Sequence, residues 1–308
     1  MNLVPNKVAF GRHESFQLRF GWLSKGFQAF EKDPDIFSKD EATVTLGVGK
    51  NMVGSIRHWL RATQMCEWTQ KDGMHATELG RAIFSKDFGW DPYLEDEATI
   101  WLIHWLLCTN PEHATAWYWF FNRFHKPEFT NKEVSTALLD FAKENITVKF
   151  TSSTVKRDAA VLLRMYIQSR ASGRMLTEEA LDSPMSLLKL ISYNPGTKTY
   201  QSKFLKRDKL PLGILAFAVS KVFEFRQISE IPIEQLMYSA DGLVAPGSVF
   251  RLSETDLLAK LEKIIRGYPD LFEIRDSGGI HQIYKMQDHD PIPFLKSHYE
   301  PIQHKVAA

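Results

Sequence analysis

Cysteine is scarce in this sequence: Cys66 and Cys108 are the only two among 308 residues. Two cysteines cannot frame a disulfide scaffold, and neither belongs to a CxxC pair or a cysteine–histidine cluster with the spacing of zinc ligands. Glycine (17) and proline (14) are too few for a collagen-like or low-complexity chain. We therefore expect a globular protein that works in the reducing cytoplasm.

Long hydrophobic runs are also missing. The most apolar stretches, 100–107 and 210–225, are too short or too interrupted to span a bilayer. Residues 1–16 lack the apolar region of a signal peptide. We therefore expect neither membrane insertion nor secretion.

The signatures of common enzyme classes are absent as well: the sequence contains no HExxH, no GxSxG and no dinucleotide-binding fingerprint. The string Gly47-Val48-Gly49-Lys50 resembles part of a phosphate loop. However, Val44 stands where a Walker A motif needs glycine, and Asn51 stands where it needs serine or threonine. A helix that begins here could still offer backbone donors, Lys50 and Asn51 to a DNA phosphate or base edge.

Charge is distributed unevenly along the chain. The net charge is +1, yet residues 145–209 hold twelve Lys/Arg against five Asp/Glu, so this segment is +7 and the remainder is −6. Such asymmetry favours a middle segment that binds a polyanion. A solvated basic surface without a ligand is the alternative.

Hydrophobic periodicity predicts a helix that begins near Lys50, followed by a hairpin over 66–76 that turns at Asp72-Gly73. Ile56, Trp59 and Leu60 fall on its apolar face. Lys50, Gly54, Arg57 and Arg61 recur on another face at helical spacing.

Two further helices follow the same pattern. One is predicted over 152–170 with Ser153 as its N-cap, and the other begins at Ser253, where Asp256 completes a capping box. A second hairpin is predicted over 272–284. A helix followed by a hairpin is typical of a winged helix.

Between these elements, residues 98–107 and 115–124 form a predicted helical pair dense in aromatic residues. Its tryptophans alternate with leucine and isoleucine, which favours a buried core over a base-stacking surface. We predict a mainly α fold with small β-hairpins, an α+β class in which winged-helix-like units surround this aromatic-rich core. The expected domains are an N-terminal one (1–126), a basic helical middle (127–209) and a C-terminal one (210–308).

Candidate catalytic residues lie near the N-terminus, where His13, Glu14 and Arg19 stand among aromatics. A histidine and a carboxylate can serve as acid, base or metal ligand, and a cation can stabilise the charge that develops in phosphodiester cleavage. A buried Glu14–Arg19 pair with a structural role is the alternative.

Asp91 and Glu95 are the candidate ligands of a divalent metal, Mg²⁺ or Mn²⁺, because these ions prefer carboxylate oxygen. The alternative is that these acids cap a helix N-terminus. The candidate DNA-binding residues share a basic or amide side chain on the predicted helices and the first hairpin. They are Lys50, Asn51, Arg57, Arg61, Lys71, Lys156, Arg157 and Arg164.

Several ordered blocks together resemble a bacterial family that is catalogued as a domain of unknown function and typified by SspB of the SspABCD DNA phosphorothioation systems. The resemblance covers essentially the whole chain. The blocks are FGRHESFQLRFGWLSKGF (10–27), LGVGKNMVGSIRHWL (46–60), DPYLEDEATIWLIHWLL (91–107), SSTVKRDAAVLLRMY (152–166) and PGSVFRLSE (246–254).

The resemblance implies a DNA nickase, an endonuclease that cuts one strand during phosphorothioate modification and restriction-like defence against phage. It also implies partners: double-stranded DNA, a cysteine desulfurase, an ATPase and a reductase-like protein. The alternative is a non-enzymatic winged-helix adaptor that delivers DNA to the sulfur-transfer partners.

Overall fold

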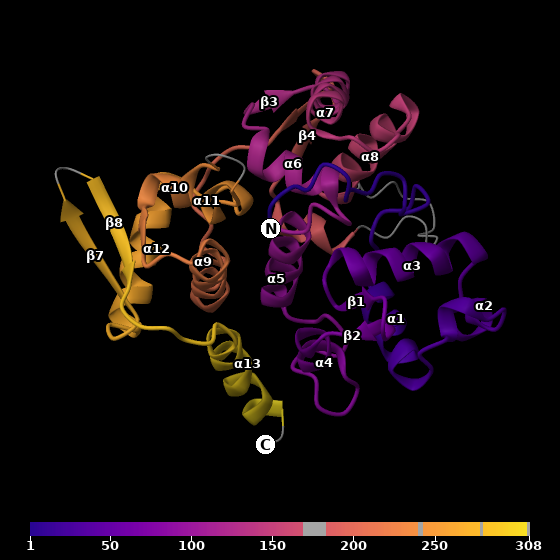
Figure 1. Ribbon diagram of the computed structural model, residues 1–308, viewed down its shortest axis with the longest axis horizontal. Helices are drawn as coiled ribbons and strands as arrows, with labels where there is room; N and C mark the ends of the chain where they lie inside the picture. Colours follow the sequence, from indigo (N-terminus) through magenta and orange to yellow (C-terminus); the bar gives the residue numbers. More distant parts are fainter. Residues whose placement is uncertain (169–182, 240–242, 278–279, 307–308) are drawn as a thin grey trace. The chain divides into compact units, whose positions relative to one another are not determined.

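The computed structural model describes residues 1–168, 183–239, 243–277 and 280–306 (Figure 1). Helices dominate, and the described strands form small antiparallel sheets of two or three strands. The prediction of a mainly α fold with small β-hairpins is confirmed. Among the described residues, none of the helices combines the length and apolar character needed to cross a bilayer.

The chain forms two compact units. The larger unit contains residues 3–120 and 126–202, and the smaller unit contains 1–2, 121–125 and 203–308. The chain therefore passes between the units at residues 3, 121, 126 and 203. The division into three domains stays a prediction.

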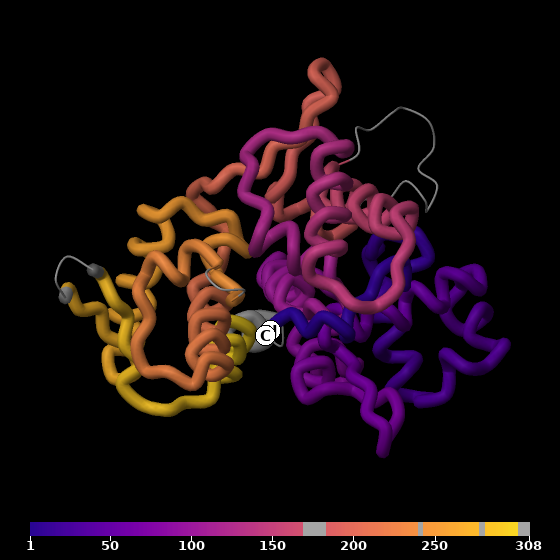
Figure 2. The backbone as a smooth tube through the Cα atoms, turned by 45° about the horizontal axis from the view of Figure 1, so that its top comes forward, coloured from indigo at the N-terminus to yellow at the C-terminus, as the bar shows by residue number. Residues whose placement is uncertain are grey.

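The larger unit begins with helices and ends with a three-stranded sheet whose β4–β5 hairpin projects from the unit (Figure 2). Its elements are α1 (Trp22–Lys32), η1 (Ile36–Ser38), α2 (Ala42–Leu46), α3 (Lys50–Ala62), β1 (Cys66–Thr69), β2 (Gly73–Ala76), α4 (Glu78–Phe84), α5 (Glu97–Cys108), the first part of α6 (Thr115–Arg123), β3 (Glu128–Phe129), α7 (Asn131–Asn145), α8 (Ser152–Met165), η3 (Pro184–Leu188), β4 (Ser192–Asn194) and β5 (Thr199–Gln201).

The aromatic helical pair is the core of this unit. All residues of α5 from Ala98 to Cys108 are buried. Trp101, Trp105, Trp117 and Trp119 are 5 % exposed or less. The prediction that these tryptophans are core residues and not a base-stacking surface is confirmed.

Helix α3 begins at Lys50, with Gly49 as its N-cap, and buries Ile56, Trp59 and Leu60. It packs against α1, where the backbone of Gly26 approaches so closely that a Cβ atom at this position would collide with the side chain of Ile56. The predicted hairpin follows as β1 and β2, which pair from Cys66–Ala76 to Thr69–Gly73. Gly73 has φ +67°, so it supplies the left-handed conformation expected of the Asp-Gly turn.

Helices α7 and α8 pack against each other. A capping box of Thr130 and Glu133 begins α7. The N-cap of α8 is Thr151, whose side chain accepts a hydrogen bond from the backbone N–H of Thr154. The prediction of Ser153 as N-cap was wrong because the helix already begins at Ser152, and the helix ends at Met165, short of the predicted Arg170.

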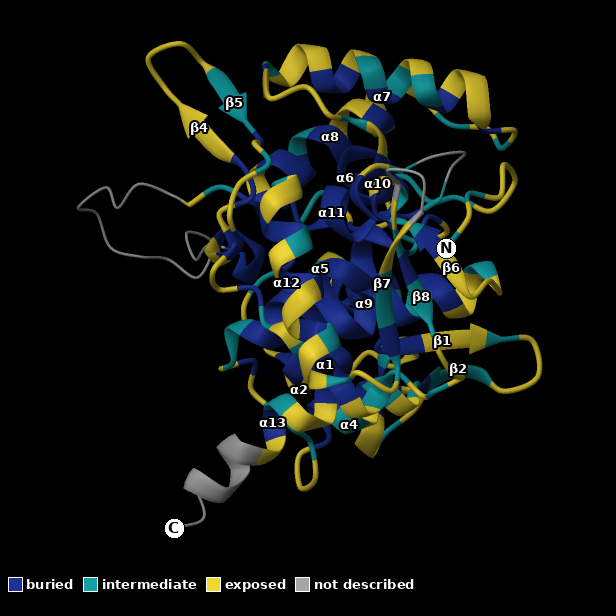
Figure 3. Cartoon of the chain, turned by 90° about the vertical axis from the view of Figure 1, so that its left-hand side faces the viewer, coloured by how far each residue is buried: buried dark blue, intermediate teal, exposed yellow. Residues whose placement is uncertain are grey.

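The smaller unit is built around α9. Its elements are the end of α6, α9 (Leu212–Arg226), β6 (Glu230–Pro232), α10 (Ile233–Met237), α11 (Pro246–Val249), α12 (Glu254–Gly267), β7 (Phe272–Ser277), β8 (Ile280–Lys285) and α13 (Ile292–Val306). Helix α9 is buried through most of its length, as Figure 3 shows in dark blue, and contacts α11, α12 and α13. The apolar stretch near residues 210–225 is thus a core helix.

Arg251 ties the end of α6 to this unit. Its guanidinium is buried and donates to the backbone carbonyls of Phe121, Phe124 and Ser248. Charged hydrogen bonds to otherwise orphaned helix-terminal carbonyls are stabilising. These bonds explain why the short segment 121–125 belongs to the smaller unit.

Helix α12 and the β7–β8 pair match the predicted helix and second hairpin, whose turn at 278–279 lies outside the described residues. Ser253 caps α12 as predicted, by accepting from the backbone N–H of Asp256. The carboxylate of Asp256 instead accepts from the backbone N–H of Arg207, so the capping box is only half formed. The winged-helix assignment stays a prediction.

Candidate nucleic-acid interface

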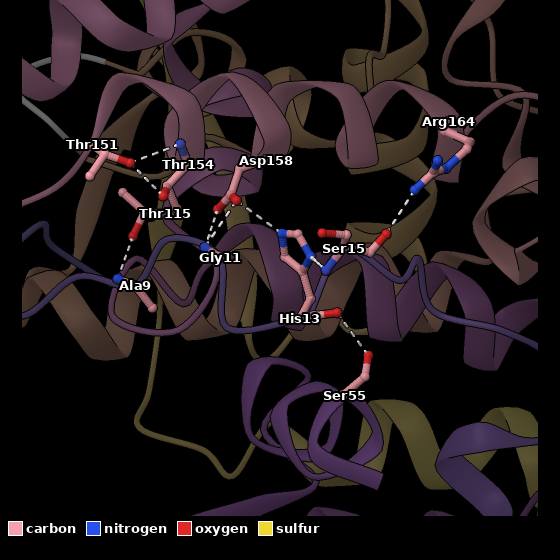
Figure 4. A network of polar contacts seen from close by, with 10 residues as sticks. All are labelled: Ala9, Gly11, His13, Ser15, Ser55, Thr115, Thr151, Thr154, Asp158 and Arg164. Carbon is pink, nitrogen blue, oxygen red and sulfur yellow. Dashed lines mark hydrogen bonds and ion pairs between the residues drawn. The ribbon is translucent and has the colours of Figure 1, made fainter. Parts of the chain in front are cut away.

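The segment 9–16 connects α3 and α8 within the larger unit. Gly11 donates its backbone N–H to both carboxylate oxygens of Asp158 in α8, at 2.9 and 3.1 Å. His13 Nε2 lies 3.0 Å from Asp158 Oδ1, and the backbone carbonyl of His13 accepts a hydrogen bond from Ser55 Oγ in α3 at 3.1 Å (Figure 4). One segment therefore fixes the two helices that carry most of the predicted DNA-binding residues.

His13 and Asp158 form a buried pair, each 1 % exposed. Ser15 donates its backbone N–H to His13 Nδ1 at 3.1 Å. Because Nδ1 accepts this bond, the imidazole proton lies on Nε2 and is donated to Asp158. The His13 ring also stacks on Trp59, with centroids 5.9 Å apart and planes 13° apart. Both ring nitrogens and one ring face are thus occupied by protein.

The backbone of segment 9–16 needs glycine at one position. Gly11 has φ +72°, and a Cβ atom there would lie 2.7 Å from the side chain of Thr154. Glu14 and Ser15 also have positive φ, 50° and 69°. These uncommon conformations turn the chain tightly enough for His13 to point inward while its neighbours Arg12 and Glu14 are exposed.

Cations stand on segment 9–16 itself and on the two helices that it connects, α3 and α8. Arg57 and Arg61 lie one turn apart on α3, and Arg164 of α8 donates to the backbone carbonyl of Ser15 at 2.9 Å. In the described part of the chain, none of the seven cations Arg12, Lys50, Arg57, Arg61, Lys156, Arg157 and Arg164 forms an ion pair with a carboxylate. We call these seven side chains, together with Asn51, the basic surface. All are exposed except Arg61, which is half-buried.

The pKa shifts beside Arg61 have burial as their largest cause and neighbouring positive charges as a second one. Burial, and next the charge of Arg57, lowers the pKa of Arg61. Burial and the charge of Arg61 lower the pKa of His113, whose Nε2 lies 3.2 Å from Arg61 Nη2. Burial, followed by the positive charges of neighbouring groups that include Arg61 and Arg12, holds the pKa of His58 well below its usual value. A bound anion would offset the repulsion between Arg57 and Arg61.

The remaining predicted residues lie in other surroundings. Lys71 is exposed in the turn between β1 and β2. Glu14 is exposed, and the guanidinium of Arg19 lies over the rings of Phe16 and Trp22, 5.7 and 5.2 Å from their centroids. The structure therefore brings His13 together with Asp158, not with Glu14 and Arg19, and the alternative of a buried Glu14–Arg19 pair was wrong.

Asp91 is a buried acceptor at the start of α5. Its Oδ1 accepts from the backbone N–H of Glu95 at 2.7 Å. Its Oδ2 accepts from the N–H of Asp96 at 3.1 Å and from Thr99 Oγ1 at 2.6 Å. Asp96 is the N-cap of α5. Asp91 therefore holds the turn that leads into α5, and Glu95 is exposed and contributes only its backbone to these bonds.

Comparison with known proteins agrees with the resemblance noted in the sequence. The family profile described as "Protein of unknown function (DUF4007)" matches residues 10–299. The chain belongs to the DUF4007 family.

Two solved structures are similar to this DUF4007 chain. An SspB crystal structure has 27 % sequence identity and a TM-score of 0.82, and a magnesium ion-bound SspB crystal structure has 26 % identity and a TM-score of 0.82. Each alignment covers 95 % of this chain and 88 % of the SspB chain. No curated protein sequence matches the chain.

The donor groups of the DUF4007 chain do not fit the predicted metal site. Asp91 is 6 % exposed, and its carboxylate accepts three hydrogen bonds from residues 95, 96 and 99, which use most of its acceptor capacity. Within residues that the structure describes, no group of three or more His, Cys, Asp or Glu side chains is arranged to hold a metal ion. We therefore derive no chemical step through a metal at this place.

Sequence reasoning identified His13 but missed Asp158. The signal was present, because Asp158 lies three residues after Val155 and four before Leu162, two residues of the apolar stripe of α8. A carboxylate on a buried helix face requires a partner. Arg12 was also left out of the predicted DNA-binding set, although it follows Gly11 directly and is exposed.

Proposed function

We propose that this DUF4007 protein binds double-stranded DNA across the basic surface and cuts one strand of it during DNA phosphorothioate modification in the cytoplasm. The observation that carries the proposal is the set of cations on α3, segment 9–16 and α8, which form no ion pairs with carboxylates among the described residues. The buried contacts of His13 with Asp158 and Ser55 hold these three elements together.

The chemistry of this surface suits a phosphate backbone. Arginine and lysine side chains displace the counterions of DNA, and helix N-termini and amide groups position the backbone. Lys50 and Asn51 stand in the first turn of α3, while Lys156 and Arg157 stand in the second turn of α8. Because His13 links the two helices, one duplex contacting both would be held in a single orientation.

Strand cutting rests on the likeness to SspB, which extends over 95 % of this chain, and on the nickase role that the family resemblance implies. Magnesium is named for one SspB structure, and we propose that cutting here also depends on Mg²⁺ or Mn²⁺. Glu14 is the first carboxylate to test, because it is exposed beside Arg12 and follows the buried His13. In this proposal His13 is a positioning residue, and Arg19 stays a candidate for charge stabilisation.

A DNA-delivering adaptor is the second candidate. It is favoured by the hydrogen bonds to both ring nitrogens of His13, which leave neither nitrogen for acid–base chemistry. The hydrogen bonds of Asp91 to the backbone N–H groups of Glu95 and Asp96 also favour it. An adaptor would bring DNA to a cysteine desulfurase, an ATPase and a reductase-like protein. It would use the same basic surface but would leave the DNA uncut.

Supercoiled plasmid separates the two candidates. The purified protein is incubated with plasmid and Mg²⁺, Mn²⁺ or EDTA, with and without the partner proteins, and open circles are measured on gels. We expect metal-dependent open circles, at least about tenfold fewer with Glu14→Gln at unchanged DNA affinity, and an unchanged yield with the surface variant Lys263→Ala in α12. Salt-sensitive DNA binding without open circles under any of these conditions would establish the adaptor.

A further inference from the structure

Three aromatic rings meet at the surface of the smaller unit. His125 follows α6, Phe204 precedes α9 and Tyr238 follows α10. The ring centroids of His125 and Phe204 lie 5.9 Å apart, those of His125 and Tyr238 6.0 Å, and those of Phe204 and Tyr238 5.8 Å. His125 is exposed, Phe204 is half-buried and Tyr238 is 45 % exposed. We call these three rings the aromatic triad.

The buried side chain of Arg251 contacts one ring of the triad, that of Phe204. The guanidinium carbon of Arg251 lies 5.2 Å from the ring centroid of Phe204 and 5.2 Å from that of Phe121. Arg251 is 1 % exposed and is held by backbone carbonyls. A cation over a ring face is attracted by it. Phe204 is therefore held by Arg251, and the triad, unlike the tryptophans of the core, remains open to solvent.

The surroundings of the triad are basic. Exposed cations stand next to it in sequence at Arg123 and Lys203. The segment 203–209 contains four Lys/Arg and one acid, Asp208, which pairs with Lys206 at 2.8 Å. Although His125 is partly open to solvent, burial of the rest of its ring, and next the charge of Arg251, lowers its pKa to about 4, so the ring is neutral at physiological pH. A neutral imidazole offers a flat face for stacking and does not add to the cationic charge around it.

We propose that the aromatic triad stacks an unpaired nucleobase of single-stranded DNA, with Arg123 and Lys203 beside its backbone. Exposed aromatic rings combined with cations are the means by which proteins bind single strands without reading sequence, because every base has a π-face. The bases of an intact duplex are already stacked on one another and cannot use such a site. This site lies in the smaller unit, apart in sequence from every residue of the basic surface.

The test compares single-stranded and duplex DNA. Binding of a fluorescein-labelled 20-nucleotide oligo(dT) and of a 20-base-pair duplex is measured by anisotropy for the wild type, Tyr238→Ala, Tyr238→Phe and His125→Ala. The matched control is Tyr193→Ala, a tyrosine of β4 that is 41 % exposed and lies against Tyr200. Thermal melts show that each variant is folded.

We expect Tyr238→Ala and His125→Ala each to raise the Kd for the single strand about tenfold. Tyr238→Phe, which keeps the ring, and Tyr193→Ala should stay within about twofold of the wild type. None of the variants should change duplex binding. An oligonucleotide made of abasic sites should bind the wild type and Tyr238→Ala equally, because it has no base to stack.

Two results would overturn the proposal: an unchanged single-strand Kd for Tyr238→Ala and His125→Ala, or an equal loss with the abasic oligonucleotide. The outcome is separable from the proposed function. A protein that fails to cut plasmid can still show the Tyr238 effect on single strands, and a protein that cuts plasmid can lack it.

Discussion

The buried pair of His13 and Asp158 is the polar centre of the candidate interface. Its two side chains are 1 % exposed and receive hydrogen bonds from Gly11 and Ser15 in addition to their own. Removing one partner leaves the other buried without its bond, which costs about 1–3 kcal/mol. We therefore expect His13→Ala to lower the free energy of unfolding by about this amount, as measured by urea denaturation.

The chain offers a matched control for this prediction. His75 and Glu67 form a histidine–carboxylate pair at the same 3.0 Å, but their side chains are 30 % and 61 % exposed. An exposed pair contributes little, so His75→Ala should cost less than about 1 kcal/mol. Equal losses for the two alanine variants would show that the His13 pair is not the anchor described above.

Both cysteines are buried, and burial raises the pKa of the Cys66 thiol to about 12. The thiolate is the reactive form, and it is nearly absent at pH 8 for such a group. We expect neither Cys66 nor Cys108 to react with a thiol reagent in the native protein, and both to react in 6 M guanidinium. Rapid labelling of one thiol under native conditions would contradict this burial.

At the scale of elements, the close approach of α1 and α3 depends on a missing side chain. A Cβ atom at Gly26 would collide with Ile56, whereas one at Gly54 of α3 meets no atom within 4 Å. Gly26→Ala should therefore destabilise the protein by about 1–3 kcal/mol through overpacking. Gly54→Ala should stabilise it by up to about 1 kcal/mol through helix propensity. Thermal denaturation of both variants checks the opposite signs, and shifts of the same sign would contradict them.

Elements with a local signal were predictable from the sequence. The apolar face of α3, the Asp72-Gly73 turn and the cap at Ser253 each involve residues close in sequence, and all three were found. The half-formed capping box at Asp256 was not predictable, because its carboxylate bonds to Arg207, 49 residues away. Hydrogen bonds between residues far apart in the sequence produce no periodic pattern in it.

The candidate site was predictable in part for the same reason. Basic residues at helical spacing marked α3 and α8. The contact between His13 and Asp158, which are 145 residues apart in the sequence, could be seen only in the structure. The aromatic triad was equally hidden, since His125, Phe204 and Tyr238 come from three distant segments.

At the scale of the whole molecule, three histidines make stability depend on pH. The pKa of His58 is held well below 6.5, that of His113 is lowered, and that of His125 is lowered to about 4. Below pH 6.5 the unfolded chain therefore binds more protons than the native protein. The free energy of unfolding should fall as pH drops from 7 to 5, by at most about 1.4 kcal/mol per pH unit for the half-buried His58 and by less for the exposed His125.

Urea denaturation at pH 7, 6 and 5 measures this dependence. His58→Gln should flatten the curve because it removes one of the three titrating groups, and adding His125→Gln should flatten it further. An identical slope for the wild type and the double variant would contradict the assignment of the pH dependence to these histidines.

The order of the chain through the two units also had to come from the structure. The chain leaves the larger unit at residue 121 and re-enters it at residue 126. Within the smaller unit, the carbonyls of Phe121 and Phe124 accept hydrogen bonds from Arg251. The arginine that makes these bonds lies more than a hundred residues away in the sequence, so its contribution could be seen only in the structure.

The salt dependence of duplex DNA binding tests the basic surface most directly. We compare the wild type with the triple variant Arg57→Ala/Lys156→Ala/Arg157→Ala and with a control of equal charge change, Lys25→Ala/Lys132→Ala/Lys263→Ala, whose residues are exposed elsewhere. The slope of log K against log salt should become shallower by about 2.7 for the first variant, which is about 0.9 per lost phosphate contact, and should stay unchanged for the control. Equal slopes for all three proteins would contradict DNA binding at this surface.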